Sequence, residues 1–324
     1  MQLITAQDYE RALLQQIPQA KRRIVIMVLD MTWGSHTSTI LKLVLEAQQR
    51  GVKTHLLYDR YSWLPMGFSK TLPSKEIRHA VKSLKKYANE LEAAGGLVSE
   101  VGKKWSLNPF ANRQHAKVTL IDDVIYSFGG VNFADDSFGY ADYMFTLQNA
   151  TLADQLAELV EKISYSPRLP NQELLLNDTS TVLFDGGTPG TSIIYDRACE
   201  LASRATQITY VSQMCPSGKL VRALKGKSIC YFNRPNQMNG MNRLGLSVDV
   251  WRYRVENHYR GTNYIHAKFM LFKMQDGSRI LLSGSNNFSW RGIAYGTKEI
   301  ALQSGNPILW DELAHFMQVH IVGV

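Results

Sequence analysis

One pattern of residues occurs twice in the chain, and it decides the fold. The first copy reads His115-Ala116-Lys117-Val118-Thr119-Leu120-Ile121, and the second reads His266-Ala267-Lys268-Phe269-Met270-Leu271-Phe272. In each copy a histidine and a lysine open a short apolar run, which predicts a strand that continues into a hairpin. Because alternate residues of a strand point to the same side, we expect the histidine and lysine of each copy to face one site.

Each predicted hairpin returns into a glycine-containing turn that ends in an asparagine. The two turns are Gly129-Gly130-Val131-Asn132 and Gly284-Ser285-Asn286-Asn287. Glycine lets the backbone approach an anion closely. Two copies of histidine, lysine and asparagine that meet across two halves of the chain would surround a single phosphodiester, and such a site requires no metal.

The elements around the two motifs also repeat, which indicates two related halves. In the first half we expect a helix at residues 5–20, an apolar strand at Arg23–Leu29, a helix from an N-cap at Thr37 or Ser38 to Gly51, and a strand at Val52–Tyr58. In the second half we expect a helix at Thr191–Ser203, a strand at Gln207–Met214, a short helix at Gly218–Leu224 and a strand at Lys227–Phe232. Apolar strands without polar alternation are typical of an α/β sheet that is covered on both faces.

Length and composition agree with two folded halves. The chain has 324 residues, enough for two domains of about 150 residues each. The segment Ser166–Asp178 contains two prolines and no clear periodicity, which predicts a linker with the boundary near Pro170. We therefore expect the first half at residues 1–169 and the second at 170–324.

The charge and the cysteines restrict the partners and the compartment. The net charge of +8 favours anionic partners, either nucleic acid or an acidic membrane surface. Cys199, Cys215 and Cys230 fit neither a disulfide framework nor paired zinc ligands, so a reducing cytoplasm is expected. The longest apolar run near the N-terminus, Ile24–Leu29, is far shorter than the ~20 residues of a membrane span. We expect a soluble or peripheral protein.

The duplicated H-x-K motif, with Asp122 in its first copy and an asparagine turn after each copy, resembles the HKD motif of the phospholipase D superfamily. The resemblance implies two pseudo-symmetric α/β/α sandwich halves packed around a shared active site, with no cofactor and no metal. It implies catalytic roles for His115, Lys117, Asn132, His266, Lys268 and Asn287, and substrate binding by Gly130 and Ser285. The second motif departs from the pattern because Lys273 stands where the first has Asp122; that aspartate is mainly structural in the family, so we expect activity to survive.

The resemblance also implies a two-step mechanism through a covalent phosphohistidine. We assign the neutral nucleophile to His115 and the protonated acid to His266, with the lysines and asparagines holding the charged oxygens. Carboxylates commonly tune and orient imidazoles. Asp142 and Glu299, which follow the two turns, are the candidates for that role.

Flanking sequence favours a lipid substrate. The segments from Ala93 to His115 and from Gly129 to Asp136 resemble the bacterial cardiolipin synthase and phosphatidylserine synthase-like branch. We therefore expect phospholipid hydrolysis or transphosphatidylation by a cytoplasmic protein that is peripheral at the inner face of the cytoplasmic membrane. A dimer is not required, because one chain carries both motifs.

A membrane contact is expected from an aromatic segment and the basic helix that follows it. Trp63, Leu64, Met66 and Phe68 would enter the interface beside an amphipathic helix at residues 74–94. In that helix Ile77, Val81, Leu84 and Leu91 are predicted to face the core, and Lys75, Arg78, Lys82, Lys85 and Lys86 to face outward.

Two other functions use the same motifs. A nuclease would track a phosphate backbone with Arg252, Arg254 and Arg260 and stack bases on Trp251, Tyr253 and Tyr259. A non-catalytic lipid- or nucleic-acid-binding module would keep the fold without turnover. The histidines outside the motifs are expected to be structural or surface residues; His258 lies nearest to a motif.

Overall fold

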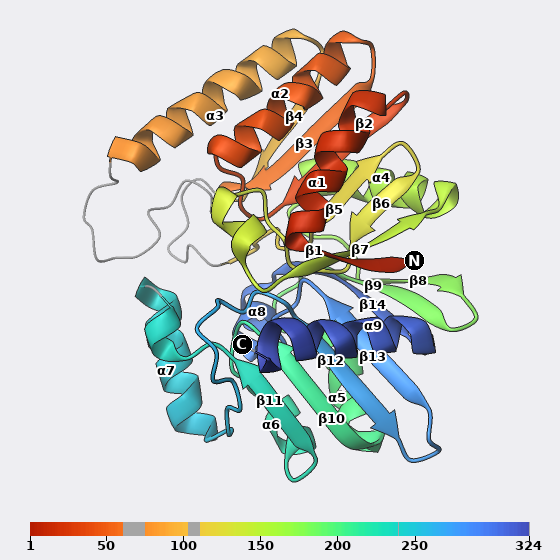
Figure 1. Cartoon of the computed structure of the whole chain (residues 1–324), viewed down its shortest axis with the longest axis vertical. Coiled ribbons are helices and arrows are strands. Elements are labelled where there is room, and N and C mark those ends of the chain that lie inside the picture. Colours follow the sequence, from red (N-terminus) through yellow and green to blue (C-terminus); the bar gives the residue numbers. More distant parts are fainter. Residues whose placement is uncertain (61–74, 103–110, 239, 324) are drawn as a thin grey trace.

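The computed structural model describes residues 1–60, 75–102, 111–238 and 240–323. These residues form two seven-stranded sheets, in the order β1-β7-β6-β5-β2-β3-β4 for the first and β11-β10-β12-β13-β14-β9-β8 for the second (Figure 1). The first sheet comes from residues 2–148 and the second from residues 172–304. The prediction of an α/β protein with two related halves is confirmed.

The first half contains strands β1 to β7 and helices α1 to α4. Its strands are β1 (Gln2–Thr5), β2 (Arg23–Val28), β3 (Lys53–Asp59), β4 (Leu97–Val101), β5 (Val118–Ile121), β6 (Val124–Ser127) and β7 (Tyr143–Gln148). Its helices are α1 (Ala6–Gln16), α2 (Ser35–Gln49), α3 (Lys75–Ala93) and α4 (Ala150–Tyr165).

The second half contains strands β8 to β14 and helices α5 to α9. Its strands are β8 (Gln172–Asn177), β9 (Ser180–Gly186), β10 (Ala205–Ser212), β11 (Ser228–Phe232), β12 (Phe269–Met274), β13 (Arg279–Gly284) and β14 (Lys298–Ser304). Its helices are α5 (Ile193–Arg204), α6 (Lys219–Leu224), α7 (Gly240–Tyr253), α8 (Trp290–Tyr295) and α9 (Pro307–Met317). None of the described helices combines the length and the apolar composition that crossing a membrane requires.

The two motif strands occupy equivalent central places. β5 pairs antiparallel with β2, which pairs parallel with β3, and β12 pairs antiparallel with β10, which pairs parallel with β11. The start of each motif strand therefore lies beside the ends of a parallel pair. This arrangement places both histidines at one end of their sheets.

The two faces of the first sheet belong to different hydrophobic cores, and one of these cores is shared with the second half. Ile24, Ile26 and Val28 point to a core that they share with α1, α2 and α3, whereas Val25 and Met27 point to the opposite face. That opposite face forms one continuous core with α4, α9 and the inner face of the second sheet. Helices α5 and α6 cover the outer face of the second sheet. The inner faces of the two sheets thus share one hydrophobic core.

The observed helix α2 begins before the predicted N-cap at Thr37 or Ser38. The Asp135 carboxylate, from a distant part of the chain, accepts hydrogen bonds from the N–H groups of Ser35 (2.5 Å), His36 (3.1 Å) and Thr37 (3.0 Å). A tertiary contact therefore supplies the acceptor that a local N-cap side chain normally supplies. Gly34 leaves room for the Asp135 carboxylate, because a Cβ on residue 34 would lie 2.4 Å from the carboxyl carbon of Asp135.

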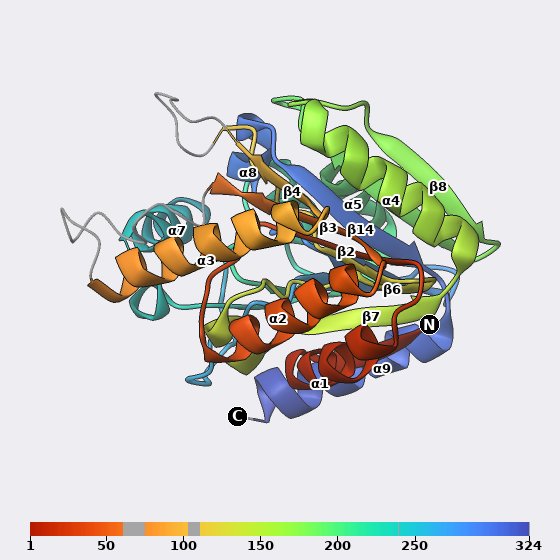
Figure 2. The same cartoon turned by 90° about the horizontal axis from the view of Figure 1, so that it is seen from above.

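Two other predictions need correction. Part of the predicted linker, Gln172–Asn177, is strand β8, which the antiparallel pairing with β9 stabilises. In α3, Leu84 and Leu91 are buried as predicted, but Ile77 is exposed because the N-terminal end of the helix extends past the sheet (Figure 2). The predicted membrane contact of Trp63, Leu64, Met66 and Phe68 lies outside the described residues.

Candidate active site

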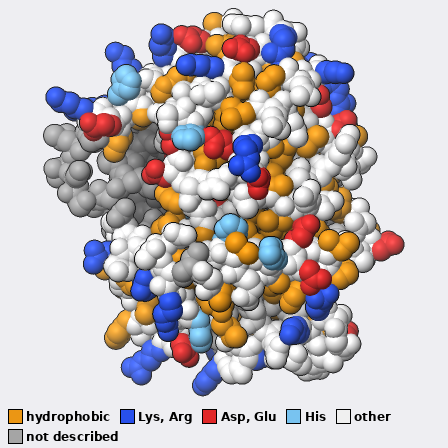
Figure 3. Space-filling view, in the orientation of Figure 1, with side chains coloured by type: hydrophobic (Ala, Val, Ile, Leu, Met, Phe, Trp, Pro, Cys, Tyr) orange, Lys and Arg blue, Asp and Glu red, His pale blue; other side chains and the backbone are white. Residues whose placement is uncertain are grey.

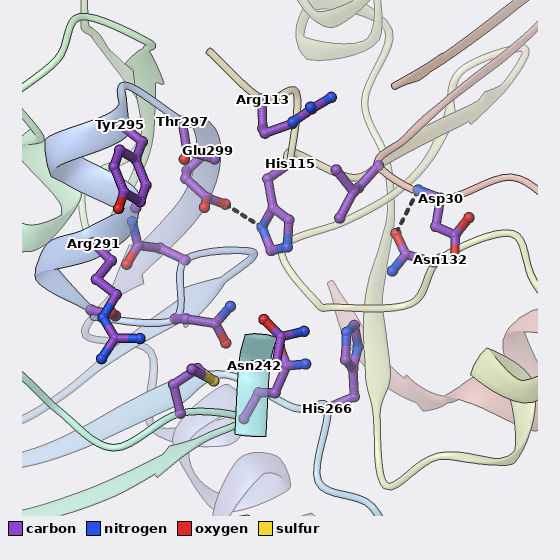
Figure 4. A pocket seen from close by; sticks show the side chains of 17 residues that line it. Asp30, Arg113, His115, Asn132, Asn242, His266, Arg291, Tyr295, Thr297 and Glu299 are labelled. Atoms are coloured by element: carbon purple, nitrogen blue, oxygen red, sulfur yellow. Dashed lines mark hydrogen bonds and ion pairs between the residues drawn. The ribbon is translucent and has the colours of Figure 1, made fainter. Parts of the chain in front are cut away.

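Both motif histidines line a single cavity of about 280 Å³ between the halves (Figure 4). Asn132 and Asn287, from the two turns, line the same cavity. Each histidine is held in place by a backbone bond to the other half. The N–H of His115 donates to the carbonyl of Lys298 at 2.9 Å, and the N–H of His266 donates to the carbonyl of Ala141 at 3.1 Å.

The two predicted carboxylates pair crosswise with the histidines. Nδ1 of His115 lies 2.9 Å from Oε2 of Glu299, and Nδ1 of His266 lies 2.7 Å from Oδ2 of Asp142. Each histidine thus contacts the carboxylate of the other half, and both carboxylates are buried. A carboxylate beside Nδ1 favours the tautomer with the proton on that nitrogen, which leaves the lone pair on Nε2.

Gly130 and Ser285 contact the carboxylates and do not line the cavity, although the sequence predicted that they bind substrate. The N–H of Gly130 donates to Asp142 at 3.2 Å, and the Ser285 hydroxyl donates to Glu299 at 2.5 Å. A Cβ at Gly130 would lie 2.7 Å from the carbonyl oxygen of His266. Both residues therefore position the groups that orient the histidines.

The two motif lysines are fully buried and do not line the cavity. Nζ of Lys117 donates to the carbonyl of His115 at 2.6 Å, and Nζ of Lys268 donates to the carbonyl of His266. Burial lowers the pKa of Lys117 to about 7 and that of Lys268 to about 8, and repulsion by the Lys268 ammonium contributes to the shift at Lys117. Asp142 and Glu299 oppose the shift of both lysines.

Burial also lowers the pKa of both histidines, to about 3 for His266. The lysine ammonium groups add to this effect, while the paired carboxylates oppose it. Both imidazoles are therefore neutral at neutral pH in the free protein. The opposite protonation states that the sequence predicted must then arise from a bound anion.

The two asparagines present amide donors to the cavity. The amide oxygen of Asn132 accepts from the N–H of Asp30 at 3.4 Å, and that of Asn287 accepts from the Ser212 hydroxyl at 3.4 Å. Since each oxygen is engaged, the amide nitrogens are the groups that remain for a ligand. The arrangement can hold an anionic phosphate between two imidazoles.

Comparisons with known proteins agree with this geometry. Residues 13–164 match the family model described as "Cardiolipin synthase, PLD-like domain". Phosphatidylserine synthase from Haemophilus influenzae superposes with a TM-score of 0.72 at 13% identity, over 99% of this chain and 86% of that chain. The first half of the chain is therefore similar to a phospholipase D-like family, and the whole chain shares the fold of the phosphatidylserine synthase structure.

Another solved structure has a similar fold. Polyphosphate kinase from Porphyromonas gingivalis superposes with a TM-score of 0.62 at 13% identity, over 98% of this chain and 46% of that chain. At such identities the likeness shows the fold alone. No curated protein sequence matches the chain.

Several residues that line the site or support it were not predicted. Arg113 is buried, lines the cavity and forms an ion pair with Asp59. Asp59 also accepts from the N–H of Gln114 at 2.8 Å, which fixes the residue before His115. In the second half Asn233 has this role, because its side chain bonds both the N–H (2.9 Å) and the carbonyl (2.7 Å) of Ile265.

Other residues that line the cavity come from the second half. Asn242 of α7 and Arg291 and Tyr295 of α8 line it (Figure 4). They lie outside the residues of both motifs, so the motif pattern did not predict them. Among the described residues no group of three or more His, Cys, Asp and Glu side chains could hold a metal ion.

The remaining predicted residues lie away from the cavity. Asp122 sits in the turn after β5 and accepts from the N–H groups of Lys21 (3.0 Å), Arg22 (2.7 Å) and Arg23 (3.1 Å). Its role is to hold the start of β2. Lys273, at the equivalent place, is exposed near the end of β12. His258 faces the ring of Tyr231 and does not line the cavity.

Proposed function

We propose that the protein transfers or hydrolyses phosphatidyl groups of phospholipids through a covalent phosphohistidine. The observation that carries the proposal is the crosswise pairing of each motif histidine with a buried carboxylate of the other half, at 2.9 and 2.7 Å. This pairing orients Nε2 of both imidazoles toward one phosphodiester. The family model of a cardiolipin synthase domain favours a lipid substrate.

Because of the charges of the site, binding of an anionic substrate favours protonation of one histidine, which then acts as the general acid. Two lysine ammonium groups, two carboxylates and two neutral imidazoles carry no net charge together. An anionic phosphodiester then favours uptake of one proton. We assign that proton to His266 and the role of nucleophile to His115, as the resemblance of the two motifs implies; Asp142 then stabilises the His266 imidazolium.

In the first step Nε2 of His115 attacks phosphorus and the bond to the leaving oxygen breaks. His266 gives its proton to that oxygen. In the second step His266 takes a proton from water or an alcohol, whose oxygen attacks phosphorus and breaks the phosphorus–nitrogen bond. Lys117, Lys268, Asn132 and Asn287 stabilise the charge on the phosphoryl oxygens in both steps.

The proposal places the protein at an anionic membrane surface, peripheral on the inner face of the cytoplasmic membrane. For the nuclease alternative, the sequence predicted that Tyr259 stacks on bases. Tyr259 is buried, so it cannot have that role. Trp251, Arg252, Arg254 and Arg260 are exposed. A nuclease and a binding module are therefore outcomes that the experiment must separate.

The purified protein is offered phosphatidylglycerol vesicles and single-stranded DNA in parallel, with EDTA present. We expect cardiolipin or phosphatidic acid to form, and we expect His115→Ala to reduce the rate by about 10²–10⁴-fold or more. His258→Ala, outside the cavity, is the matched control and retains activity. DNA cleavage without lipid turnover would favour the nuclease, and turnover of neither substrate would contradict the proposal.

A diester with a p-nitrophenol leaving group separates the roles of the histidines, because that group leaves without a proton. We expect His266→Ala to release one equivalent of p-nitrophenol in a burst and then stall, and His115→Ala to show no burst. The reverse result would exchange the two assignments.

A further inference from the structure

Helix α7 has an orientation that is fixed by its buried face. Gly245, Leu246 and Asp249 are buried. The guanidinium of Arg291 in α8 lies 2.8 Å from the Asp249 carboxylate and also donates to the carbonyl of Gly245 at 2.5 Å. These contacts hold α7 beside the cavity that Asn242, near its start, helps to line.

The opposite face of α7 is apolar and exposed. Leu244 is 59% exposed, Val248 45% and Trp251 77%. Their spacing puts them on one stripe that covers an arc of roughly 60° of the helix surface. A surface helix normally turns polar residues to water, and a grouped apolar face marks an interaction site.

The charges on this helix are arranged around the stripe. Arg252 lies along one edge of the stripe and Arg243 along the other, and both are exposed. The acidic residue of α7, Asp249, is buried in its ion pair with Arg291 and adds no negative charge to the surface. The exposed face therefore combines apolar side chains with positive charge.

The same side of the molecule carries further basic residues. The N-terminal end of α3 and helix α7 lie on one side in both views (Figures 1 and 2). Lys75, Arg78 and Lys82 of α3 are exposed there, together with Ile77. Lys and Arg side chains lie over both regions in the space-filling view (Figure 3). The positive charge thus extends beyond one helix.

We propose that the exposed face of α7 docks on a bilayer rich in anionic phospholipid. Leu244, Val248 and Trp251 enter the interface, and Arg243 and Arg252 contact the phosphate headgroups. Because Asn242 and Arg291 connect α7 to the cavity, docking presents the cavity to the headgroup layer. This inference rests on the proposed lipid function and names the surface that delivers the substrate.

A bilayer fits this face better than single-stranded nucleic acid. Nucleic acid recognition without sequence preference uses several aromatic rings in a basic groove. The stripe on α7 offers one exposed ring and two aliphatic side chains, which suit the acyl boundary of a membrane.

The test is sedimentation of the full chain with vesicles of phosphatidylglycerol or of phosphatidylcholine alone. We expect binding to phosphatidylglycerol vesicles, weakened about fivefold for each of Arg243→Gln and Arg252→Gln. Leu244→Ser with Trp251→Ala should weaken binding at least tenfold. Leu175→Ser is the matched control, because Leu175 on β8 is 76% exposed but lies outside the stripe.

Catalysis is measured separately on a short-chain phosphatidyl substrate below its micellar concentration. The α7 variants should keep the wild-type rate there and lose activity on vesicles, and unchanged thermal unfolding would show that they are folded. Vesicle binding by the α7 variants equal to that of the wild type would overturn the docking surface.

A wild-type protein that binds vesicles through α7 but turns over no soluble diester would leave the docking surface standing and refute the proposed activity. Loss of single-stranded DNA binding in the variants, with no vesicle binding by the wild type, would assign the surface to nucleic acid and overturn the proposal.

Discussion

At the residue scale the site depends on buried carboxylates that change the proton affinity of the two histidines. His115 and His266 lose affinity for protons through burial, while Glu299 and Asp142 restore part of it. The sequence predicted both carboxylates. It could not predict that each would serve the histidine of the other half, because that pairing depends on how the halves pack.

The lysines set an expected pH dependence. In the proposed mechanism their ammonium groups must stay charged to stabilise the phosphoryl oxygens, and their pKa values are lowered to about 7 for Lys117 and about 8 for Lys268. As pH rises through these values the protons are lost, so kcat/KM should fall above about pH 7 to 8. Since the pKa of both histidines is below 6.5, the acidic decline should lie below pH 6.5.

Measurement of kcat/KM against pH on a soluble diester checks this prediction. Lys298 is the control, because its pKa is also lowered to about 8 but it has no role in the proposed mechanism. Its ammonium group donates to the carbonyl of Pro167. The alkaline decline should persist in Lys298→Met. A decline that begins only near pH 10 would show that the buried lysines keep ordinary pKa values.

At the element scale, several helices and strands depend on contacts with distant parts of the chain. Helix α2 begins at Ser35 because Asp135 accepts its first N–H groups, and β8 forms because β9 offers a partner. The predicted periodicities found helices α1, α2, α3, α5 and α6 and strands β2, β3, β5, β10, β11 and β12. Helices α4, α7, α8 and α9 and several strands, β8 among them, were not predicted.

Asp135→Ala should destabilise the protein through helix α2. The substitution leaves the N–H groups of Ser35, His36 and Thr37 without that acceptor, and loss of an N-cap costs about 0.5–2 kcal/mol. Urea unfolding measures the change in the free energy of unfolding. Asp136→Ala, at the exposed neighbouring position, should change it by less than about 0.5 kcal/mol. Equal effects of both variants would contradict the capping role.

At the scale of the whole molecule the halves share one core and one site. The inner core combines Val118 and Phe145 of the first sheet with Phe269 and Ile300 of the second. Across this junction the Tyr143 hydroxyl lies 2.6 Å from that of Ser283, which donates to the carbonyl of Phe128 at 2.6 Å. The predicted boundary at residues 169 and 170, between α4 and β8, stays a prediction.

We expect the shared core to make unfolding a single cooperative transition. Calorimetry should then give equal calorimetric and van't Hoff enthalpies. Tyr9→Phe removes a bond of 2.7 Å to Thr119 inside the first half and should cost about 1 kcal/mol. In a cooperative molecule that variant lowers the melting temperature of the whole chain. Two transitions, of which Tyr9→Phe shifts only one, would show that the halves unfold independently.

The sequence by itself determined the two α/β halves, the two histidine and lysine motifs, the asparagine turns and the two carboxylates. These features can be predicted from local sequence, because periodicity and spacing along the chain indicate which side chains share a face of a helix or strand. Only the tertiary structure decided that the carboxylates pair crosswise, that Gly130 and Ser285 hold them, and that Arg113, Asn242 and Arg291 complete the cavity. The tertiary structure also decided which face of α7 is exposed. The crosswise pairs join residues from different halves, so they exist only after the halves pack around their shared core, and the other contacts depend on how each half folds.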